Sequence, residues 1–291
     1  MWRLLVVLVV AVVSSLVGCG RVSFDALALD SAIDARPDAP IDAAFGPPQL
    51  VAVSSSVDEE DPSLTDDMLE MYFDANPGLV RVTRTAIDQP WSSRVLVMEL
   101  GTGSTVNNAK ISGDGLALYF TSRRVPSDAA DIWYATRPDR TSLFSAPQLV
   151  GGVQTSSDEY EPMAVGDGHV IYFSRAILTE SLWRASRAST MDPFADTTNI
   201  PELDSPAYEG GIWVSADERV AYFHSDRVSS AERMIFRASR ADASDPFGTP
   251  VAVSEIDLPG KLEDPWLSPD GHTLYFASDT SGQYDIYMAT R

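Results

Sequence analysis

The stretch Glu263–Asp279, EDPWLSPDGHTLYFASD, joins a polar Asp-Gly turn to a pair of adjacent aromatic residues. A short polar turn followed by such an aromatic pair occurs five times, with the pairs at intervals of 47, 53, 50 and 53 residues. The pairs are Tyr72-Phe73, Tyr119-Phe120, Tyr172-Phe173, Tyr222-Phe223 and Tyr275-Phe276. A period of this length indicates stacked copies of one supersecondary unit, so the repeat predicts the fold.

Each unit shares further pieces around its aromatic pair. An apolar stretch precedes the turn, a short ending that closes on arginine follows the pair, and a last piece opens with an aromatic residue. The alternating polarity and the Asp-Gly turns predict four short antiparallel strands per unit. Adjacent tyrosine and phenylalanine point to opposite faces of a strand, so we expect both faces to be buried between similar sheets. The sequence therefore predicts an all-β fold, a five-bladed β-propeller of four-stranded antiparallel blades.

The two ends of the repeat region predict how the ring closes. The fifth unit stops at Arg291 and lacks its fourth strand. Phe45–Val51, FGPPQLV, closely resembles Phe144–Val150, FSAPQLV, which closes the second unit. We therefore expect residues 47–53 to form the outer strand of the last blade, which leaves no blade with a bare edge. The predicted propeller domain is 45–291.

The first residues have a different character. An unbroken apolar run from Leu4 to Val13 follows Arg3, and it is too short to span a bilayer but typical of a signal peptide. The run leads to Leu16-Val17-Gly18-Cys19, which resembles the lipobox of bacterial lipoproteins. Cys19 is the only cysteine in the chain, so it cannot form an intramolecular disulfide. We expect residues 1–18 to be removed and Cys19 to carry acyl chains such as palmitate; the alternative is an ordinary secretory signal.

Residues 19–44 comprise the lipidated cysteine and a tether rich in Asp, Ala and Pro, which we expect to be disordered. Gly20, rather than aspartate, follows the cysteine, which favours the outer membrane of a Gram-negative-type cell, with a periplasmic or surface-exposed domain. The formal net charge of −21 argues against nucleic acid as a partner. It also argues against lying on anionic lipid by charge, so we expect membrane contact through the anchor alone. We expect a monomer.

The repeat also carries a family resemblance. Glu263–Asp279, continued by Tyr284–Arg291, resembles the WD40-like propeller repeat of the TolB family, and the resemblance extends over essentially residues 45–291. TolB propellers usually contain six such units, whereas this chain has five. The resemblance implies a periplasmic propeller that binds an envelope protein or peptide and has no assigned reaction.

Carboxylates at the start of the first strand of each unit are the candidate binding site. Asp61, Glu161 and Asp264 occupy one repeat position, where the second unit has Asn108 and the fourth has Gly211, with Glu209 close by. Around a propeller these residues would form a ring at one mouth of the axial channel. One interpretation is structural, with each acid capping its own strand or bonding backbone NH groups of the next blade. The other is a mouth that binds a cation or a basic peptide segment.

The sequence contains no nucleophile motif, no HExxH helix and no phosphate-binding glycine loop, so we expect no catalysis, no cofactor and no metal site. His169 and His272 follow Asp-Gly turns and are expected to be exposed, and His224 has no evident Ser or Cys partner. The alternative hypothesis is a five-bladed glycoside hydrolase, or a glycan-binding propeller, using the carboxylates at the channel mouth. Trp213 and Trp266 could stack on sugars, although packing between blades explains them more simply.

Overall fold

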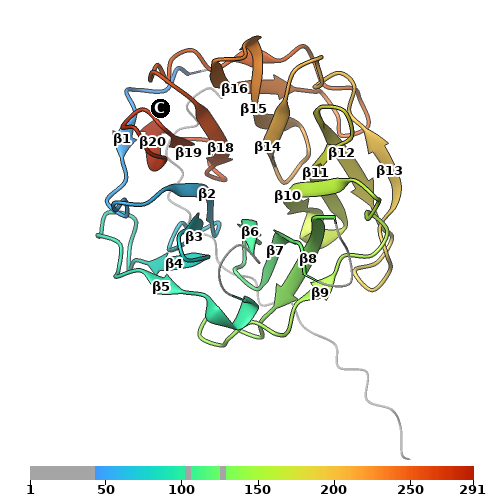
Figure 1. Cartoon of the computed structure of the whole chain (residues 1–291), viewed down its shortest axis with the longest axis horizontal. Coiled ribbons are helices and arrows are strands. Elements are labelled where there is room, and N and C mark those ends of the chain that lie inside the picture. The colour runs from blue at the N-terminus through green and yellow to red at the C-terminus, as the bar shows by residue number, and fades with distance from the viewer. Residues whose placement is uncertain (1–42, 102–105, 125–128) are drawn as a thin grey trace, which may run out of the picture. The chain divides into compact units, whose positions relative to one another are not determined.

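The computed structural model describes residues 43–101, 106–124 and 129–291. Within these residues it contains five four-stranded antiparallel sheets arranged in a ring (Figure 1). The predicted five-bladed β-propeller is therefore confirmed. The predicted signal peptide, Cys19 and residues 20–42 of the predicted tether lie outside the described residues. Within the described part of the chain, no helix is long and apolar enough to cross a membrane.

The first four blades are each formed by four consecutive strands. Blade 1 contains β2 (Glu59–Leu64), β3 (Glu70–Ala75), β4 (Val80–Thr83) and β5 (Val95–Leu96). Blade 2 contains β6 (Asn107–Ile111), β7 (Ala117–Ser122), β8 (Asp131–Thr136) and β9 (Gln148–Leu149). Blade 3 contains β10 (Asp158–Val165), β11 (Val170–Ala176), β12 (Glu180–Ser186) and β13 (Ala195–Asn199). Blade 4 contains β14 (Glu209–Val214), β15 (Val220–Ser229), β16 (Glu232–Ser239) and β17 (Val251–Ala252).

Blade 5 joins the two ends of the described chain. It contains β18 (Leu262–Leu267), β19 (Thr273–Ser278), β20 (Asp285–Thr290) and, as its outer strand, β1 (Gln49–Leu50). The predicted closure by an N-terminal strand is confirmed, since Gln49 pairs with Met288 and Leu50 with Tyr287. The strand starts later than the predicted 47–53 because Pro47 and Pro48 have no NH group to donate. It ends earlier because the chain turns after it, where the NH groups of Val53 and Ser54 bond Val51 O.

The innermost strands β2, β6, β10, β14 and β18 surround the axis of the ring (Figure 1). The described helical segments are the short 3-10 turns η1 (Met98–Leu100) and η3 (Gly166–Gly168). All five Tyr-Phe pairs are buried, with no more than 6% of any of these residues exposed. The core therefore lies between neighbouring blades, as the aromatic pairs predict.

The arginine that closes each unit fixes the inner turn to the outer strand. In each unit the Nε of this arginine donates a hydrogen bond to a backbone carbonyl in the turn between the first two strands. The five arginines are Arg84, Arg137, Arg187, Arg240 and Arg291. Each guanidinium also lies 4.1–4.8 Å from the ring of the aromatic that opens the outer piece, namely Trp91, Phe144, Phe194, Phe247 and Phe45. Because Phe45 comes from the N-terminal segment, Arg291 binds the two ends of the chain together.

Candidate functional site

A β-bulge in the innermost strand of every blade defines the position of the candidate residues. The pairing register between the first and second strands shifts at this point in all five sheets. One residue of each bulge has a positive φ, between 52° and 59°: Asp61, Asn108, Glu161, Gly211 and Asp264. Bulges re-aim a side chain that a regular strand would point elsewhere. The residues aligned by the repeat therefore share one unusual backbone conformation.

Two of these carboxylates bond the backbone of the next blade. Glu161 Oε2 accepts hydrogen bonds from the Gly211 NH at 2.5 Å and from Ser174 Oγ at 2.5 Å. Asp264 Oδ2 accepts the NH of Asp61 at 3.3 Å, across the junction of blades 5 and 1. Glu161 and Asp264 are 5% and 4% exposed. Both carboxylates therefore contribute to the joining of neighbouring blades.

Asp61 instead bonds side chains of the next blade. Its Oδ1 forms an ion pair with Lys110 Nζ at 3.1 Å, and its Oδ2 accepts a hydrogen bond from Asn108 Nδ2 at 2.9 Å. Lys110 is 5% exposed, which is rare for lysine unless its charge is paired. This buried ion pair links blades 1 and 2.

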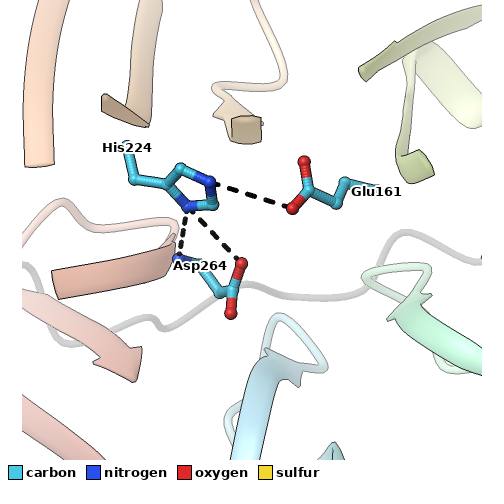
Figure 2. Close-up of side chains that lie close together, drawn as sticks. All are labelled: Glu161, His224 and Asp264. Carbon is cyan, nitrogen blue, oxygen red and sulfur yellow. Dashed lines mark hydrogen bonds and ion pairs between the residues drawn. The ribbon is translucent and has the colours of Figure 1, made fainter. Parts of the chain in front are cut away.

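The bulge residue of blade 4 is Gly211, which has no side chain, and the imidazole of His224 fills this space. His224 belongs to β15, the second strand of blade 4, and passes the backbone of Gly210 and Gly211 in β14. A Cβ on Gly211 would lie 2.6 Å from His224 Nδ1, and one on Gly210 would lie 2.7 Å from Nε2. The imidazole can therefore reach Glu161 and Asp264 because both inner residues are glycine (Figure 2).

The imidazole is held on several sides. Its Nδ1 accepts the NH of Asp264 at 3.1 Å and lies 3.6 Å from Asp264 Oδ1. Its Nε2 lies 3.9 Å from Glu161 Oε1. The ring of Tyr208 stacks on it with 5.7 Å between centroids. Because a backbone NH must donate, Nδ1 is the acceptor and Nε2 carries the proton in this arrangement.

Burial controls the protonation of this cluster. Burial, followed by the charge of Asp61, raises the pKa of the Glu161 carboxyl to about 7. The same two causes raise the pKa of Asp264 well above its usual range. Burial, with smaller effects of Arg233 and Lys110, lowers the pKa of His224 well below its usual range. The imidazole is therefore neutral at pH 7, and both carboxyl groups hold a proton more readily than exposed carboxyl groups do.

Glu209 lies apart from this ring. It occupies the repeat position of Glu59 and Glu159, two residues before the bulge residue. Its carboxylate accepts a hydrogen bond from Ser205 Oγ at 2.5 Å and forms an ion pair with Arg227 at 3.1 Å. Of the candidates from the sequence, the structure thus brings together Asp61, Asn108, Glu161 and Asp264, and gives Glu209 a separate set of partners.

A cavity of about 480 Å³ lies at one end of the axis. All five innermost strands contribute to its lining, through Leu64, Ile111, Met163, Trp213 and Trp266. The turns that follow these strands form its rim, and the charged side chains of the lining are Asp66, Asp114 and Asp167. The lining does not include Asp61, Asn108, Glu161 or Asp264. The cavity, which offers space for a ligand, therefore lies at a different height along the axis of the ring from the buried carboxylates.

The two tryptophans line this cavity while packing within their blades. Trp213 and Trp266 are 8% and 5% exposed. Each forms an edge-to-face contact with the tyrosine of its own blade, Tyr222 or Tyr275, at centroid distances of 6.1 Å and 5.9 Å. The indoles therefore serve the core and also form the floor of the cavity.

Sequence reasoning missed the parts of the cluster contributed by Lys110 and His224. Lys110 lies two residues after Asn108 in the first strand of its unit, so the sequence could have indicated that its side chain lies near the candidate site. The signal for His224 was weaker, because it required noticing that Gly210-Gly211 leaves a space next to the second strand. His169 and His272 lie at turns, as expected, but are only partly exposed.

No protein-family model and no curated protein matches this sequence. Solved structures of TolB proteins are similar in fold. TolB from Agrobacterium tumefaciens has a TM-score of 0.51 and 19% identity, over 77% of this chain and 71% of that one. TolB from Acinetobacter baumannii has a TM-score of 0.51 and 14% identity, over 82% of this chain and 56% of that one. The described domain is a TolB-like β-propeller in its fold, and it spans little more than half of the Acinetobacter protein.

Structures of GH62 α-L-arabinofuranosidases are also similar. The enzyme from Podospora anserina has a TM-score of 0.59 and 9% identity, over 87% of this chain and 98% of that one. The catalytic domain from Coprinopsis cinerea has a TM-score of 0.58 and 12% identity, over 85% and 96%. At such identities the likeness concerns the fold alone, and a shared fold does not assign function.

We expect Gly211→Ala to lower stability by about 2–5 kcal/mol. A non-glycine residue at positive φ costs roughly 1–2 kcal/mol, and overpacking against the imidazole adds about 1–3 kcal/mol. In a His224→Ala background the two closest contacts are removed and only that with Asp264 Oδ1 at 3.0 Å remains, so the cost of Gly211→Ala should fall toward that of the backbone. Urea unfolding of the four proteins of this double-mutant cycle measures the difference. Additive costs would show that His224 does not fill the space beside Gly211.

Proposed function

We propose that this chain is a lipid-anchored cell-envelope β-propeller that binds a partner protein or peptide at its axial cavity. The cavity at the axis, with two indoles and Met163 in its lining, is the observation that carries the proposal. Aromatic and methionine side chains are typical of binding surfaces for protein segments. Asp66, Asp114 and Asp167 supply the charge of the lining, so a segment with both apolar and cationic residues fits it best.

The buried carboxylates support binding rather than catalysis. A general acid or nucleophile must come within hydrogen-bond reach of its substrate. Glu161 and Asp264 bond backbone NH groups of the next blade, and Asp61 pairs with Lys110. These contacts agree with the structural interpretation of the ring and leave ligand binding to the cavity.

Photo-crosslinking in cells tests the proposal. A photoreactive residue at Ala216, on the cavity rim, should give discrete adducts with one partner. The same residue at Leu143, which is exposed and absent from the cavity lining, serves as the control. Adduct formation at Ala216 should decrease in an Asp114→Asn/Asp167→Asn background, because exposed charges attract a cationic segment over about 10 Å at 0.1 M salt. Equal adduct patterns at the two positions would contradict binding at the cavity.

The second candidate function is hydrolysis or binding of a glycan. The similarity in fold to GH62 enzymes is the observation that favours it. The raised pKa of Glu161 is a property expected of a general acid. A screen against arabinans, xylans and fructans tests hydrolysis, with Glu161→Gln as the matched variant. Turnover by the unaltered protein that is lost in Glu161→Gln would favour the enzyme.

The proposed anchor at Cys19 makes a separate prediction. Cys19→Ser should abolish acylation and leave an unprocessed precursor, because lipoprotein signal peptidase cleaves only after lipidation of the cysteine. Several acyl chains hold a protein firmly on a membrane, whereas one chain binds only marginally. Metabolic labelling with a palmitate analogue, followed by fractionation, measures both effects. Absence of label in the unaltered protein would contradict the lipoprotein hypothesis.

A further inference from the structure

When its carboxyl groups are ionised, the cluster around His224 contains more negative charge than its cationic groups neutralise. Lys110 forms its ion pair with Asp61. Among the described residues, the one ion-pair partner within 4 Å of Glu161 or Asp264 is His224, whose imidazole is neutral when Nδ1 accepts a backbone hydrogen bond. Two carboxyl groups, each at most 5% exposed, therefore share one neutral ring. A buried pair of this kind is expected to bind protons or a cation.

The carboxylates present their remaining oxygens to the imidazole. Among the described residues, the hydrogen bonds to Glu161 and Asp264 side chains fall on Oε2 and Oδ2. Oε1 of Glu161 and Oδ1 of Asp264 are the carboxylate oxygens that face the ring nitrogens (Figure 2). One ligand atom from each of the three residues lies within 4.8 Å of the other two. The inter-blade bonds thus orient these oxygens toward one point.

An unpaired nitrogen provides independent evidence for a ligand. His224 Nε2 is buried and has no hydrogen-bond partner among the described residues, while the whole residue is 1% exposed. A buried polar atom without a partner is rare in native proteins and often marks an unseen ion or water. Nε2 points toward Glu161 (Figure 2). Tyr208 stacks on one face of the ring, so the imidazole is held in this direction.

We propose that Glu161, His224 and Asp264 form a divalent-cation site at the axis of the propeller. Glu161 Oε1 and His224 Nε2 supply the protein ligands, water completes the coordination, and the Asp264 carboxylate holds the other ring nitrogen. This set of ligands suits a first-row transition metal, with Zn²⁺ as the probe, better than Mg²⁺. Ligand atoms about 2.1 Å from a tetrahedral Zn²⁺ lie about 3.4 Å apart. The gap of 3.9 Å between Nε2 and Glu161 Oε1 needs only a small side-chain adjustment to reach this value.

Binding at Nε2 requires the ring proton to move to Nδ1. The Nδ1–H group would then face Asp264 Oδ1, now 3.6 Å away, in place of the present bond from the Asp264 NH. A carboxylate that accepts the second ring proton is the usual partner of a metal-bound histidine. The site lies outside the lining of the axial cavity, so it does not depend on the proposed partner binding.

Metal analysis of the full chain tests this inference. After treatment with a chelator and dialysis against limiting ZnCl₂, we expect about one equivalent of Zn²⁺ per chain and a higher melting temperature, because binding to the folded state stabilises it. MgCl₂ should produce neither effect. Glu161→Gln and His224→Gln should each weaken Zn²⁺ binding by at least about tenfold, since even the loss of an outer contact to a metal ligand has that effect.

Glu159→Gln is the matched control. Glu159 is on the same strand as Glu161, is 0% exposed and pairs with Arg175 at 2.9 Å. This substitution should lower the melting temperature but retain the Zn²⁺-dependent increase. Circular dichroism checks the fold of each variant, and Asp264→Asn, which alters the carboxylate behind the imidazole, provides a third variant of the site if one does not fold. No Zn²⁺ uptake by the unaltered chain, or equal uptake by the ligand variants, would overturn the proposal.

Discussion

Deletion of residues 45–53 is expected to unfold the propeller or lower its melting temperature by more than about 10 °C. The deletion removes β1, whose neighbours also bond β20 through Gly46 NH to Thr290 O and Val51 NH to Ile286 O, each at 2.8 Å. It also removes Phe45, Val51 and Val53, all at most 6% exposed. Burial of such side chains contributes about 1.5–3 kcal/mol each, and their sum is comparable to the total stability of many domains.

Two further variants separate the causes of this effect. Deletion of residues 22–42, in the predicted tether, should leave the melting temperature nearly unchanged. Phe45→Ala keeps the strand but removes the ring beneath Arg291, so we expect a loss of about 3–5 kcal/mol. Thermal melts of the three proteins give the comparison. Similar melting temperatures for the two deletions would contradict closure of blade 5 by the N-terminal segment.

Lys110→Met is expected to destabilise the propeller by about 3–5 kcal/mol, the usual cost of removing one partner of a buried ion pair. The methionine fills a similar volume, so the change mainly removes charge. Asp61 would retain its hydrogen bond from Asn108 but lose its cationic partner 3.1 Å away. Chemical denaturation with unchanged m-value would assign the loss to the native state.

Adding Asp61→Asn to Lys110→Met should recover most of this stability. Asparagine tolerates the positive φ of this position, as Asn108 does in blade 2, and its side-chain oxygen still accepts a hydrogen bond. Replacement of a buried ion pair by neutral groups is often close to neutral in energy. If the double variant were less stable than Lys110→Met, the cost would come from lost packing around Lys110 rather than from the buried charge of Asp61.

The blade count, strand order and ring closure could be predicted from the sequence. Each blade makes the same contacts with its neighbours, so the same residue types recur at a fixed period. The clearest case is FGPPQLV at Phe45–Val51, which matches the closing segment of blade 2 and pairs with β20 as predicted. The repeat also aligned Asp61, Asn108, Glu161 and Asp264, because a bulge with one backbone conformation recurs in each inner strand.

The composition of the central cluster was decided only by the tertiary structure. His224 is in the second strand of its blade, at a position where other blades have Asp74, Thr121, Ser174 and Ala277. Asp74 and Thr121 accept the backbone NH of the next blade's bulge residue as His224 does, but this shared contact joins strands of different blades and became visible only in the structure. His224 reaches Glu161 and Asp264 because two glycines of β14 leave the space open. Glu209 lies two residues before the aligned position. On a bulged strand this offset gives its side chain different neighbours, so it bonds Ser205 and Arg227 instead. The repeat in the sequence thus determined the contacts that recur in every blade. The contacts of residues that differ from the repeat, such as His224, depend on side chains that meet only when the blades pack around the ring.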